Sequence, residues 1–219
     1  MKAIVFDLDG TLINSAPDVH AVCNRLLWEE HLPPVTLSQT RGFIGNGVSV
    51  LIDRLMHATG MPIDDARHAD LQTRFMAQYE DAVNLTKPYP FAFETLDALA
   101  GDGWAIGLCT NKPMAPARAV LAHFDLTDRF AAIIAGDSLF NRKPDPAPLL
   151  ATMKALGAER VVYVGDSEVD AETAYRAHQP MALFTEGYRR TPVDTMPHDF
   201  AFSDFRELPA AAARLLETA

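Results

Sequence analysis

The sequence predicts an α/β fold in which a parallel sheet flanked by helices carries an inserted helical domain. Three observations predict it: an apolar run over residues 3–6 that predicts a strand over residues 2–6, helical periodicity over about residues 15–86, and alternating strand and helix patterns from residue 87 onward. Alternation of this kind implies parallel strands with helices on both faces of the sheet. The predicted domains are an α/β core, residues 1–14 and 87–219, and a helical insert, residues 15–86.

The bulk composition describes a chain that can bury a sizeable core. It has 219 residues, of which 48% are hydrophobic, and a formal net charge of −10. This charge argues against nonspecific binding to nucleic acid or to anionic membranes, and no segment approaches the roughly 18 uninterrupted apolar residues of a membrane span. Cys23 and Cys109 are far apart, so neither a disulfide framework nor a zinc site is indicated, and a cytoplasmic location is expected.

The first strand ends in two carboxylates. Asp7 and Asp9 follow the apolar run and precede Gly10. Side chains two residues apart in an extended chain point the same way, and two close anions repel unless a cation or a proton lies between them. The functional interpretation is a nucleophilic Asp7 beside a second acid, with a divalent metal between them and a phosphate. The alternative is a solvated Asp-x-Asp-Gly turn.

The insert shows apolar residues at helical spacing, which predicts amphipathic helices that pack on one another. The residues are Val19, Val22, Cys23, Leu26 and Leu27, then Val48, Leu51, Ile52, Leu55 and Met56, then Leu71, Phe75, Tyr79 and Ala82. The connections near residues 14 and 87 are expected to be hinges, with the insert as a lid over the strand ends.

The rest of the core is expected to supply five more strands, at residues 105–109, 132–135, 160–164, 180–184 and 199–202. The first strand should join the same sheet, because one strand cannot bury its two faces alone. Open α/β sheets bind ligands at the carboxyl ends of their strands. Polar residues that follow these strands are therefore candidate site residues.

Two of the strands are followed by groups that suit an anion. Thr110 and Asn111 offer a hydroxyl and free amides at the start of a helix, although either residue could simply cap that helix. Lys143 lies before Pro144, which biases it toward extended backbone, and a fixed ammonium suits a phosphate oxygen. The alternative for Lys143 is that it is solvated, as most lysines are.

A further strand end carries Asp166, followed four residues later by Asp170. This spacing fits one metal ligand and one residue that orients the site. Acids in a first helical turn also complement the helix dipole, but that does not explain why Asp166 ends an apolar strand after a glycine. All four polar clusters fall at carboxyl ends of predicted parallel strands, and their joint pattern is the strongest functional signal in the chain.

In these clusters the chain resembles the haloacid dehalogenase-like phosphatase superfamily over essentially its whole length. The four motifs occur in order: Asp7-x-Asp9-Gly10-Thr11, Thr110-Asn111, Lys143-Pro144 and Gly165-Asp166-x3-Asp170. Within the superfamily, three less specific segments resemble the phosphoglycolate phosphatases: residues 14–18, Gly45-Asn46-Gly47 and Thr110-Asn111-Lys112-Pro113.

The resemblance implies a Rossmann-like core with a helical cap, and Mg²⁺ held by Asp7, the backbone carbonyl of Asp9, and Asp166. It implies that Asp7 attacks phosphorus to give an aspartyl-phosphate, while Asp9 protonates the leaving alkoxide and then activates water. Asp170 would hold Lys143 or the metal ligands in position. The implied phosphate-binding residues are Gly10, Thr110, Asn111 and Lys143.

In the cap, Arg41 and the Gly45-Asn46-Gly47 loop are the candidates for recognising the far end of a small phosphorylated substrate. A carboxylate such as that of 2-phosphoglycolate suits an arginine or exposed amides. The alternative is that the glycines turn the chain and Asn46 caps a helix beginning near Val48. For Arg41, the interpretation without a substrate-binding role is favoured. For the loop, both interpretations are left open.

Several other activities share the core residues, among them pyrophosphate hydrolysis and sugar-phosphate hydrolysis or mutation. The mutase is less favoured, because the histidine of β-phosphoglucomutases aligns with Val19 here, and His20 comes one residue late. A dehalogenase would not need the acid Asp9. A noncatalytic binding protein on this fold would be expected to have lost at least one of Asp7, Asp9, Lys143 and Asp166. The sequence leaves the oligomeric state, monomer or homodimer, open.

Overall fold

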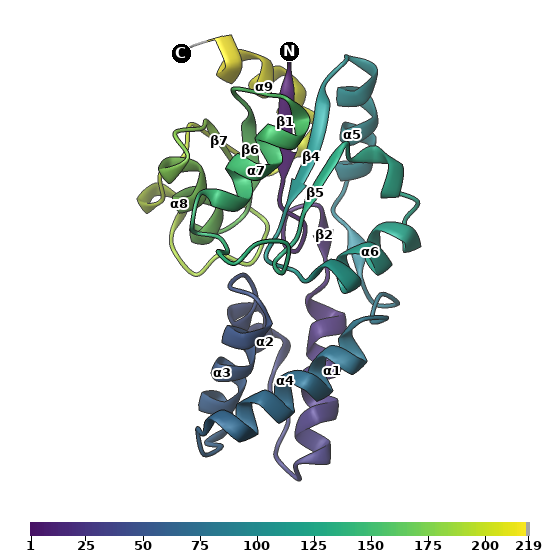
Figure 1. The fold of residues 1–219 in the computed structure, drawn as a ribbon, viewed down its shortest axis with the longest axis vertical. Coiled ribbons are helices and arrows are strands. Elements are labelled where there is room, and N and C mark those ends of the chain that lie inside the picture. Colours follow the sequence, from purple (N-terminus) through teal and green to yellow (C-terminus); the bar gives the residue numbers. More distant parts are fainter. Residues whose placement is uncertain (218–219) are drawn as a thin grey trace.

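A six-stranded sheet forms the centre of the fold, and the predicted α/β class is confirmed (Figure 1). The computed structural model describes residues 1–217. The strand order is β5-β4-β1-β6-β7-β8, and each strand is parallel to its neighbours. The strands are β1 (Ala3–Phe6), β4 (Ala105–Cys109), β5 (Ala132–Ile134), β6 (Val162–Gly165), β7 (Met181–Phe184) and β8 (Phe200–Phe202). All of them lie within two residues of the predicted bounds.

Helices cover both faces of the sheet, and β1 shows why its sequence is apolar throughout. Its side chains alternate between the faces: Ile4 and Phe6 lie in one hydrophobic cluster, Ala3 and Val5 in the other, and all four are fully buried. The first cluster includes residues of α5 (Ala92–Gly101), α6 (Met114–His123) and α9 (Leu208–Glu217). The second includes residues of α7 (Ala147–Leu156) and α8 (Glu168–Arg176).

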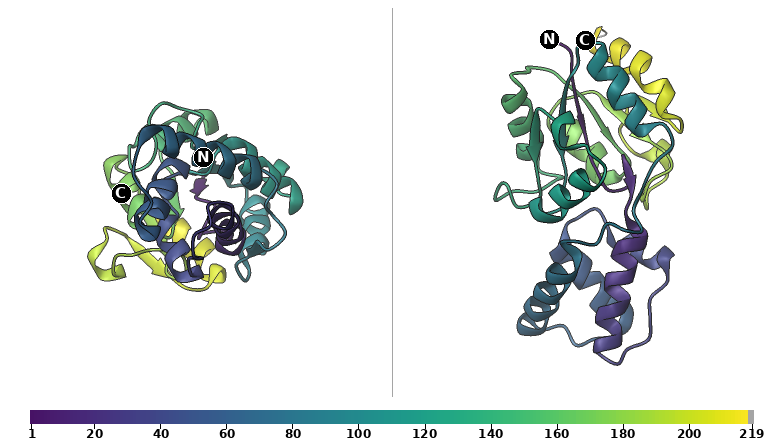
Figure 2. Two further views of the ribbon diagram at one scale, coloured as in Figure 1. Left: turned by 90° about the horizontal axis from the view of Figure 1, so that it is seen from below. Right: turned by 90° about the vertical axis from the view of Figure 1, so that its right-hand side faces the viewer.

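The four remaining α-helices share a hydrophobic cluster of their own, around residues such as Leu26, Ile52 and Phe75. They are α1 (Ala16–Glu29), α2 (Leu37–Phe43), α3 (Val48–Thr59) and α4 (Asp65–Tyr79), here called the cap. Figures 1 and 2 place the cap beyond the carboxyl ends of the strands. The division of the chain into two domains with the bounds given above stays a prediction. Within residues 1–217, no helix combines the length and the apolarity needed to cross a membrane.

The two connections between core and cap lie side by side. Ile13–Asn14 (β2) pairs antiparallel with Lys87–Pro88 (β3). Asp18 at the start of α1 adds to this pairing, since its carboxylate accepts hydrogen bonds from the Leu85 backbone N–H at 3.1 Å and from the Thr86 hydroxyl at 2.6 Å. The predicted hinge positions are therefore joined to each other by backbone and side-chain contacts.

Candidate active site

The carboxyl end of β1 carries the first two candidate residues, Asp7 and Asp9. The backbone N–H of Asp7 donates to the Val164 carbonyl of β6 at 2.8 Å, so β1 still follows its neighbour at this point. Gly10 then turns the chain at φ +91°, and a Cβ there would lie only 2.5 Å from Asp166 Oδ2. Glycine is thus required both for the turn and for the approach of Asp166.

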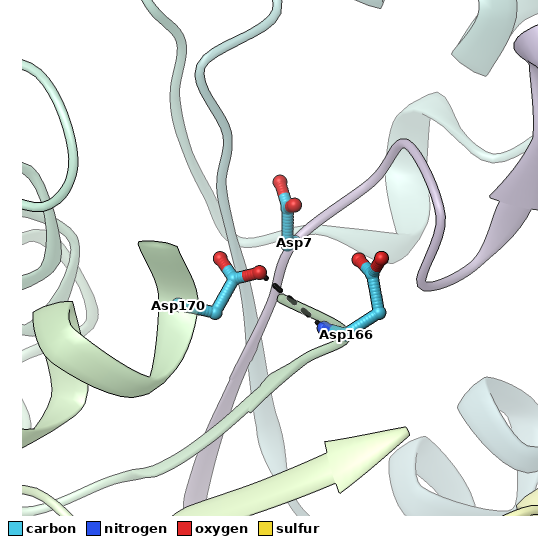
Figure 3. Close-up of side chains that lie close together, drawn as sticks. All are labelled: Asp7, Asp166 and Asp170. Atoms are coloured by element: carbon cyan, nitrogen blue, oxygen red, sulfur yellow. Dashed lines mark hydrogen bonds between the residues drawn. The ribbon is translucent and has the colours of Figure 1, made fainter. Parts of the chain in front are cut away.

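Three buried carboxylates converge at this point. Oxygens of Asp7, Asp166 and Asp170 all lie within 4.8 Å of one another. Figure 3 shows that these side chains come from the end of β1, the end of β6 and the first turn of α8. Burial, together with the charge of Asp170, raises the pKa of Asp7 to about 6 despite the nearby Lys143. Burial, followed by the charges of Asp170 and Asp7, also raises the pKa of Asp166 well above its ordinary value. Such a cluster favours binding of a cation.

Asp170 differs from the other two acids because its oxygens are already occupied. Its Oδ1 accepts hydrogen bonds from Lys143 Nζ at 2.7 Å and from the Tyr163 hydroxyl at 3.0 Å. Its Oδ2 accepts from the backbone N–H groups of Asp166 and Ser167 and from the Ser167 hydroxyl, the last at 2.6 Å. The geometry suits a residue that orients its neighbours rather than a metal ligand.

Asp7 and Asp166 retain capacity for a cation. Asp7 Oδ1 is buried and forms an ion pair with the Lys143 ammonium at 3.0 Å, but among the described residues it accepts no regular hydrogen bond. Each oxygen of Asp166 accepts one hydrogen bond, from the Thr11 hydroxyl at 2.8 Å and from the Tyr188 backbone N–H at 2.6 Å. A carboxylate oxygen has two lone pairs, so both residues could ligate a hard cation.

Lys143 lies buried among the core acids. Its Nζ contacts Asp7, Asp170 and the Tyr163 hydroxyl at 3.0, 2.7 and 2.8 Å. Burial lowers the pKa of Lys143, but the charges of Asp170 and Asp7 outweigh that effect and raise it. Burial likewise disfavours ionised Asp170, yet the charge and hydrogen bond of Lys143 keep the pKa of this carboxyl below its usual value. The pair is therefore a charged one at neutral pH.

The side chain of Asn111 joins three segments. Its Nδ2 donates to the carbonyls of Gly45 and Lys143, each at 2.9 Å, and its Oδ1 accepts from the Lys143 backbone N–H at 3.0 Å. This amide connects the cap loop to the loop that carries the lysine. The neighbouring Thr110 Oγ1 accepts a hydrogen bond from the Lys112 backbone N–H at 3.2 Å, which leaves its own proton for an acceptor in the site.

Lys112 is a site residue that the sequence reasoning did not single out. Its Nζ lies 3.1 and 3.3 Å from the two carboxylate oxygens of Asp9 and contacts the Tyr79 hydroxyl of α4. Asp9 also accepts a hydrogen bond from the Ser15 hydroxyl at 2.5 Å. The position of Lys112, directly after Thr110 and Asn111 at a strand end, was the available signal.

A small cavity of about 40 Å³ lies between the cap and the strand ends. Core residues and the loop before α3 form its polar part, and apolar side chains of the cap form the rest. Its lining consists of Asp7, Asp9, Thr110, Asn111, Lys112, Pro113, Val19, Ile44, Gly45, Gly47, Val48, Leu51 and Tyr79. The cavity thus brings Asp7 and Asp9 next to side chains of the cap.

The cap candidates divide into two groups. Gly45 and Gly47 line the cavity and have positive φ values of 113° and 86°, so the glycines do turn the chain. The alternative that Asn46 caps the following helix is wrong, because Gly47 occupies the N-cap position without a side-chain cap, and Asn46 Oδ1 instead accepts a hydrogen bond from Arg54 at 2.7 Å. Arg41 is exposed and does not line the cavity.

Comparison with known proteins gives a consistent result. The sequence profile of the haloacid dehalogenase-like hydrolases matches residues 4–184. A phosphoglycolate phosphatase of Cereibacter sphaeroides is 56% identical, over 99% of this chain and 100% of its own length. One from Rhodobacter capsulatus is 43% identical over 94% of each chain. A solved structure from Haemophilus somnus, described as a predicted phosphoglycolate phosphatase, superposes with a TM-score of 0.90 at 30% identity and covers 96% of this chain and 97% of its own.

Proposed function

This chain belongs to the haloacid dehalogenase-like hydrolases, and we propose that within this family it is a Mg²⁺-dependent phosphomonoester hydrolase that cleaves 2-phosphoglycolate to glycolate and phosphate. The observation that carries the proposal is the arrangement at the end of β1, where Asp7 faces a buried ammonium and an acidic cluster while Asp9 faces the cavity. The substrate assignment is supported by full-length relatives that are named phosphoglycolate phosphatases.

The residues present fit Mg²⁺. Asp7 has a buried oxygen without a hydrogen bond, Asp166 has lone pairs to spare, and within residues 1–217 the backbone carbonyl of Asp9 accepts no hydrogen bond. These three oxygen donors would hold the ion, which prefers hard oxygen ligands and substrate phosphates. When bound, Mg²⁺ supplies positive charge that neutralises the transferring phosphoryl group.

Asp7 is the proposed nucleophile. Its carboxylate oxygen forms a bond to phosphorus as the bond from phosphorus to the ester oxygen breaks, which leaves an aspartyl-phosphate. The Lys143 ammonium, 3.0 Å from Asp7 Oδ1, offsets the negative charge that gathers there and is close enough to reach a phosphoryl oxygen. The Thr110 hydroxyl, which also lines the cavity, is the proposed donor to a second phosphoryl oxygen.

Asp9 is the proposed acid and base. It gives a proton to the departing ester oxygen, so that glycolate leaves as an alcohol, and then takes a proton from the water that attacks the aspartyl-phosphate. The second attack breaks the bond from phosphorus to Asp7 and releases phosphate. Hydrogen bonds from Ser15 and Lys112 hold the Asp9 carboxylate in place at the cavity.

The test of the reaction class is phosphate release in the presence of Mg²⁺ by the wild-type protein and by Asp7→Asn. We expect release by the wild type alone, and mass spectrometry of acid-quenched protein should find a phosphoryl group on Asp7. Equal rates from the two proteins, or no release from either, would exclude this mechanism.

The test of the substrate is a comparison of kcat/KM for 2-phosphoglycolate, pyrophosphate and small sugar phosphates. We expect the highest value for 2-phosphoglycolate. A clear preference for pyrophosphate or for a sugar phosphate would replace the glycolate assignment while leaving the proposed chemistry intact.

A further inference from the structure

The buried side-chain ammonium of Lys112 lies where the cavity meets the cap. Only 5% of Lys112 is exposed, and its ammonium lies between Asp9 of the core and Tyr79 of the cap. It also lies over the Tyr79 ring, 4.2 Å from the ring centroid. Lysines are rarely buried to this degree without a charged partner or a function. Among residues 1–217, Lys112 has one carboxylate partner, Asp9, which also accepts a hydrogen bond from the Ser15 hydroxyl.

Lys112 and Tyr79 together offer donors to an incoming anion. The Tyr79 hydroxyl accepts a hydrogen bond from the ammonium, and among the described residues it donates none in return. Its proton is therefore available to an acceptor in the cavity, which Tyr79 helps to line. An anionic oxygen that enters there could accept from the phenol and from the ammonium at once, and hydrogen bonds to ionised groups are the strong ones.

The position of Asp9 limits how far the anionic group can lie from the scissile bond. Asp9 must be within hydrogen-bond reach of the ester oxygen to protonate it, and Lys112 Nζ is 3.1 Å from Asp9 Oδ1. The sum of three hydrogen-bond lengths therefore places a group held by Lys112 within about 9 Å of the ester oxygen. A phosphate ester whose carboxylate is attached close to the ester carbon meets this requirement.

We propose that Lys112, assisted by the Tyr79 hydroxyl, determines specificity by binding the carboxylate of the leaving group. The inference rests on the proposed function and names the residue that gives the protein its preference for 2-phosphoglycolate. It assigns this task to a cation of the core loop after β4 rather than to Arg41, which is exposed and does not line the cavity.

The experiment compares kcat/KM for 2-phosphoglycolate with kcat/KM for 2-hydroxyethyl phosphate, in which a neutral CH₂OH group replaces the carboxylate. The full-length protein is assayed with Mg²⁺ as wild type, Lys112→Met, Lys112→Arg, Tyr79→Phe and Arg41→Met. Lys154→Met is the matched control, because Lys154 is an exposed lysine of α7. Circular dichroism and the unfolding temperature verify that each variant is folded.

We expect the wild type to prefer the carboxylate about 10- to 100-fold, the ratio that a charge-assisted hydrogen bond provides. Lys112→Met should lose most of that preference, mainly through a higher KM for 2-phosphoglycolate. Lys112→Arg should keep much of it, and Tyr79→Phe should reduce it about threefold. Arg41→Met and Lys154→Met should leave the ratio unchanged.

Three outcomes overturn the inference. Lys112→Met could lower both activities equally, which would mean that the residue only positions Asp9. The ratio of kcat/KM for 2-phosphoglycolate to kcat/KM for 2-hydroxyethyl phosphate could be the same in Lys112→Met as in the wild type. Alternatively, Arg41→Met could abolish the preference for 2-phosphoglycolate. If Lys112→Met does not fold, Lys112→Arg and Tyr79→Phe decide by the same ratio. A wild type without any preference for 2-phosphoglycolate refutes the glycolate proposal itself, whereas a preference that persists in the variants refutes only the role of Lys112.

Discussion

Two buried lysines serve the two aspartates of the β1 terminus in different ways. Lys143 contacts Asp7 and is held by Asp170 and Tyr163, which all belong to the core. Lys112 contacts Asp9 and, beyond it, a tyrosine of the cap helix α4. The surroundings of Asp7 are thus complete within the α/β core, whereas those of Asp9 extend across the boundary to the cap.

The comparison shows how one site can be rigid at one residue and dependent on the cap at the next. Moving the cap away from the core would leave every described contact of Lys143 unchanged. The same motion would separate Tyr79 from Lys112, and it would also break the hydrogen bond from Asn111 to Gly45. Asp7, the proposed nucleophile, is therefore preorganised, while the surroundings of Asp9, the proposed acid, depend on the position of the cap.

The largest expected difference in unfolding free energy and in kcat is that between Lys143→Met and Lys112→Met. Removing Lys143 leaves Asp7 and Asp170 buried without their cation, so we expect a loss of about 3–5 kcal/mol in unfolding free energy and a fall of about 10³-fold in kcat. Urea denaturation and phosphate release measure the two quantities. If Lys112→Met is as harmful to stability and to kcat as Lys143→Met, the contrast between the two lysines is wrong.

Asp170→Asn should have the next largest effect. It keeps the shape of the side chain but removes half of the negative charge that Lys143 faces, and the new amide cannot accept all the hydrogen bonds that Asp170 receives. We expect a loss of about 3 kcal/mol in unfolding free energy and a fall in kcat of about 10- to 100-fold. The exposed Asp137→Asn serves as control; a variant as stable as the wild type would show that the pair does not hold the core together.

The metal-free protein should lose stability as the pH rises. The pKa of Asp7 is about 6 in the folded protein against 3.8 for the ordinary group, so the folded state retains protons that the unfolded state has released. Stability therefore decreases as pH rises from about 4 through 6, and Mg²⁺ should restore it at pH 7. Thermal unfolding in EDTA, with Asp7→Asn beside the wild type, measures this: the advantage of the variant should grow across that interval. A constant difference would contradict the raised pKa of Asp7 in the folded protein.

The smallest effect is expected from Ser15→Ala. The substitution removes one hydrogen bond to Asp9, at 2.5 Å, but leaves the contact between Asp9 and Lys112 intact. We expect kcat to fall about three- to tenfold, and the unfolding free energy to fall by no more than about 1.5–3 kcal/mol, the contribution of one hydrogen bond to a charged group. An equal fall in Lys112→Met and Ser15→Ala would show that the two partners of Asp9 are interchangeable.

Most of the fold could be predicted because the sheet strands are buried and apolar. The strand at Ala105–Cys109 has the predicted bounds, and its neighbours deviate by one or two residues. The β2–β3 pair was missed because two residues per strand give no periodic pattern. The short α2 was not separately predicted either, although Thr36 and Gln39 form the capping box that starts it.

The site could be predicted only where its residues follow strands. The motif positions at strand ends require no knowledge of the cap, and their catalytic roles stay predictions. The contacts of Lys112 and of the Asn111 side chain were not foreseen, because their partners Asp9, Tyr79 and Gly45 come from segments far away in the sequence. No local pattern reports contacts of this kind, which depend on how the cap packs against the core.

The position of β1 in the sheet has a consequence for the order of folding. Both of its neighbours, β4 and β6, follow the cap in the sequence, and Ala3 pairs with Ala105. During synthesis, β1 must therefore wait until the whole cap and β4 have left the ribosome, whereas the cap helices contact mostly one another and can fold as soon as they emerge. The strand that precedes both aspartates is then an unpaired apolar segment until β4 is available.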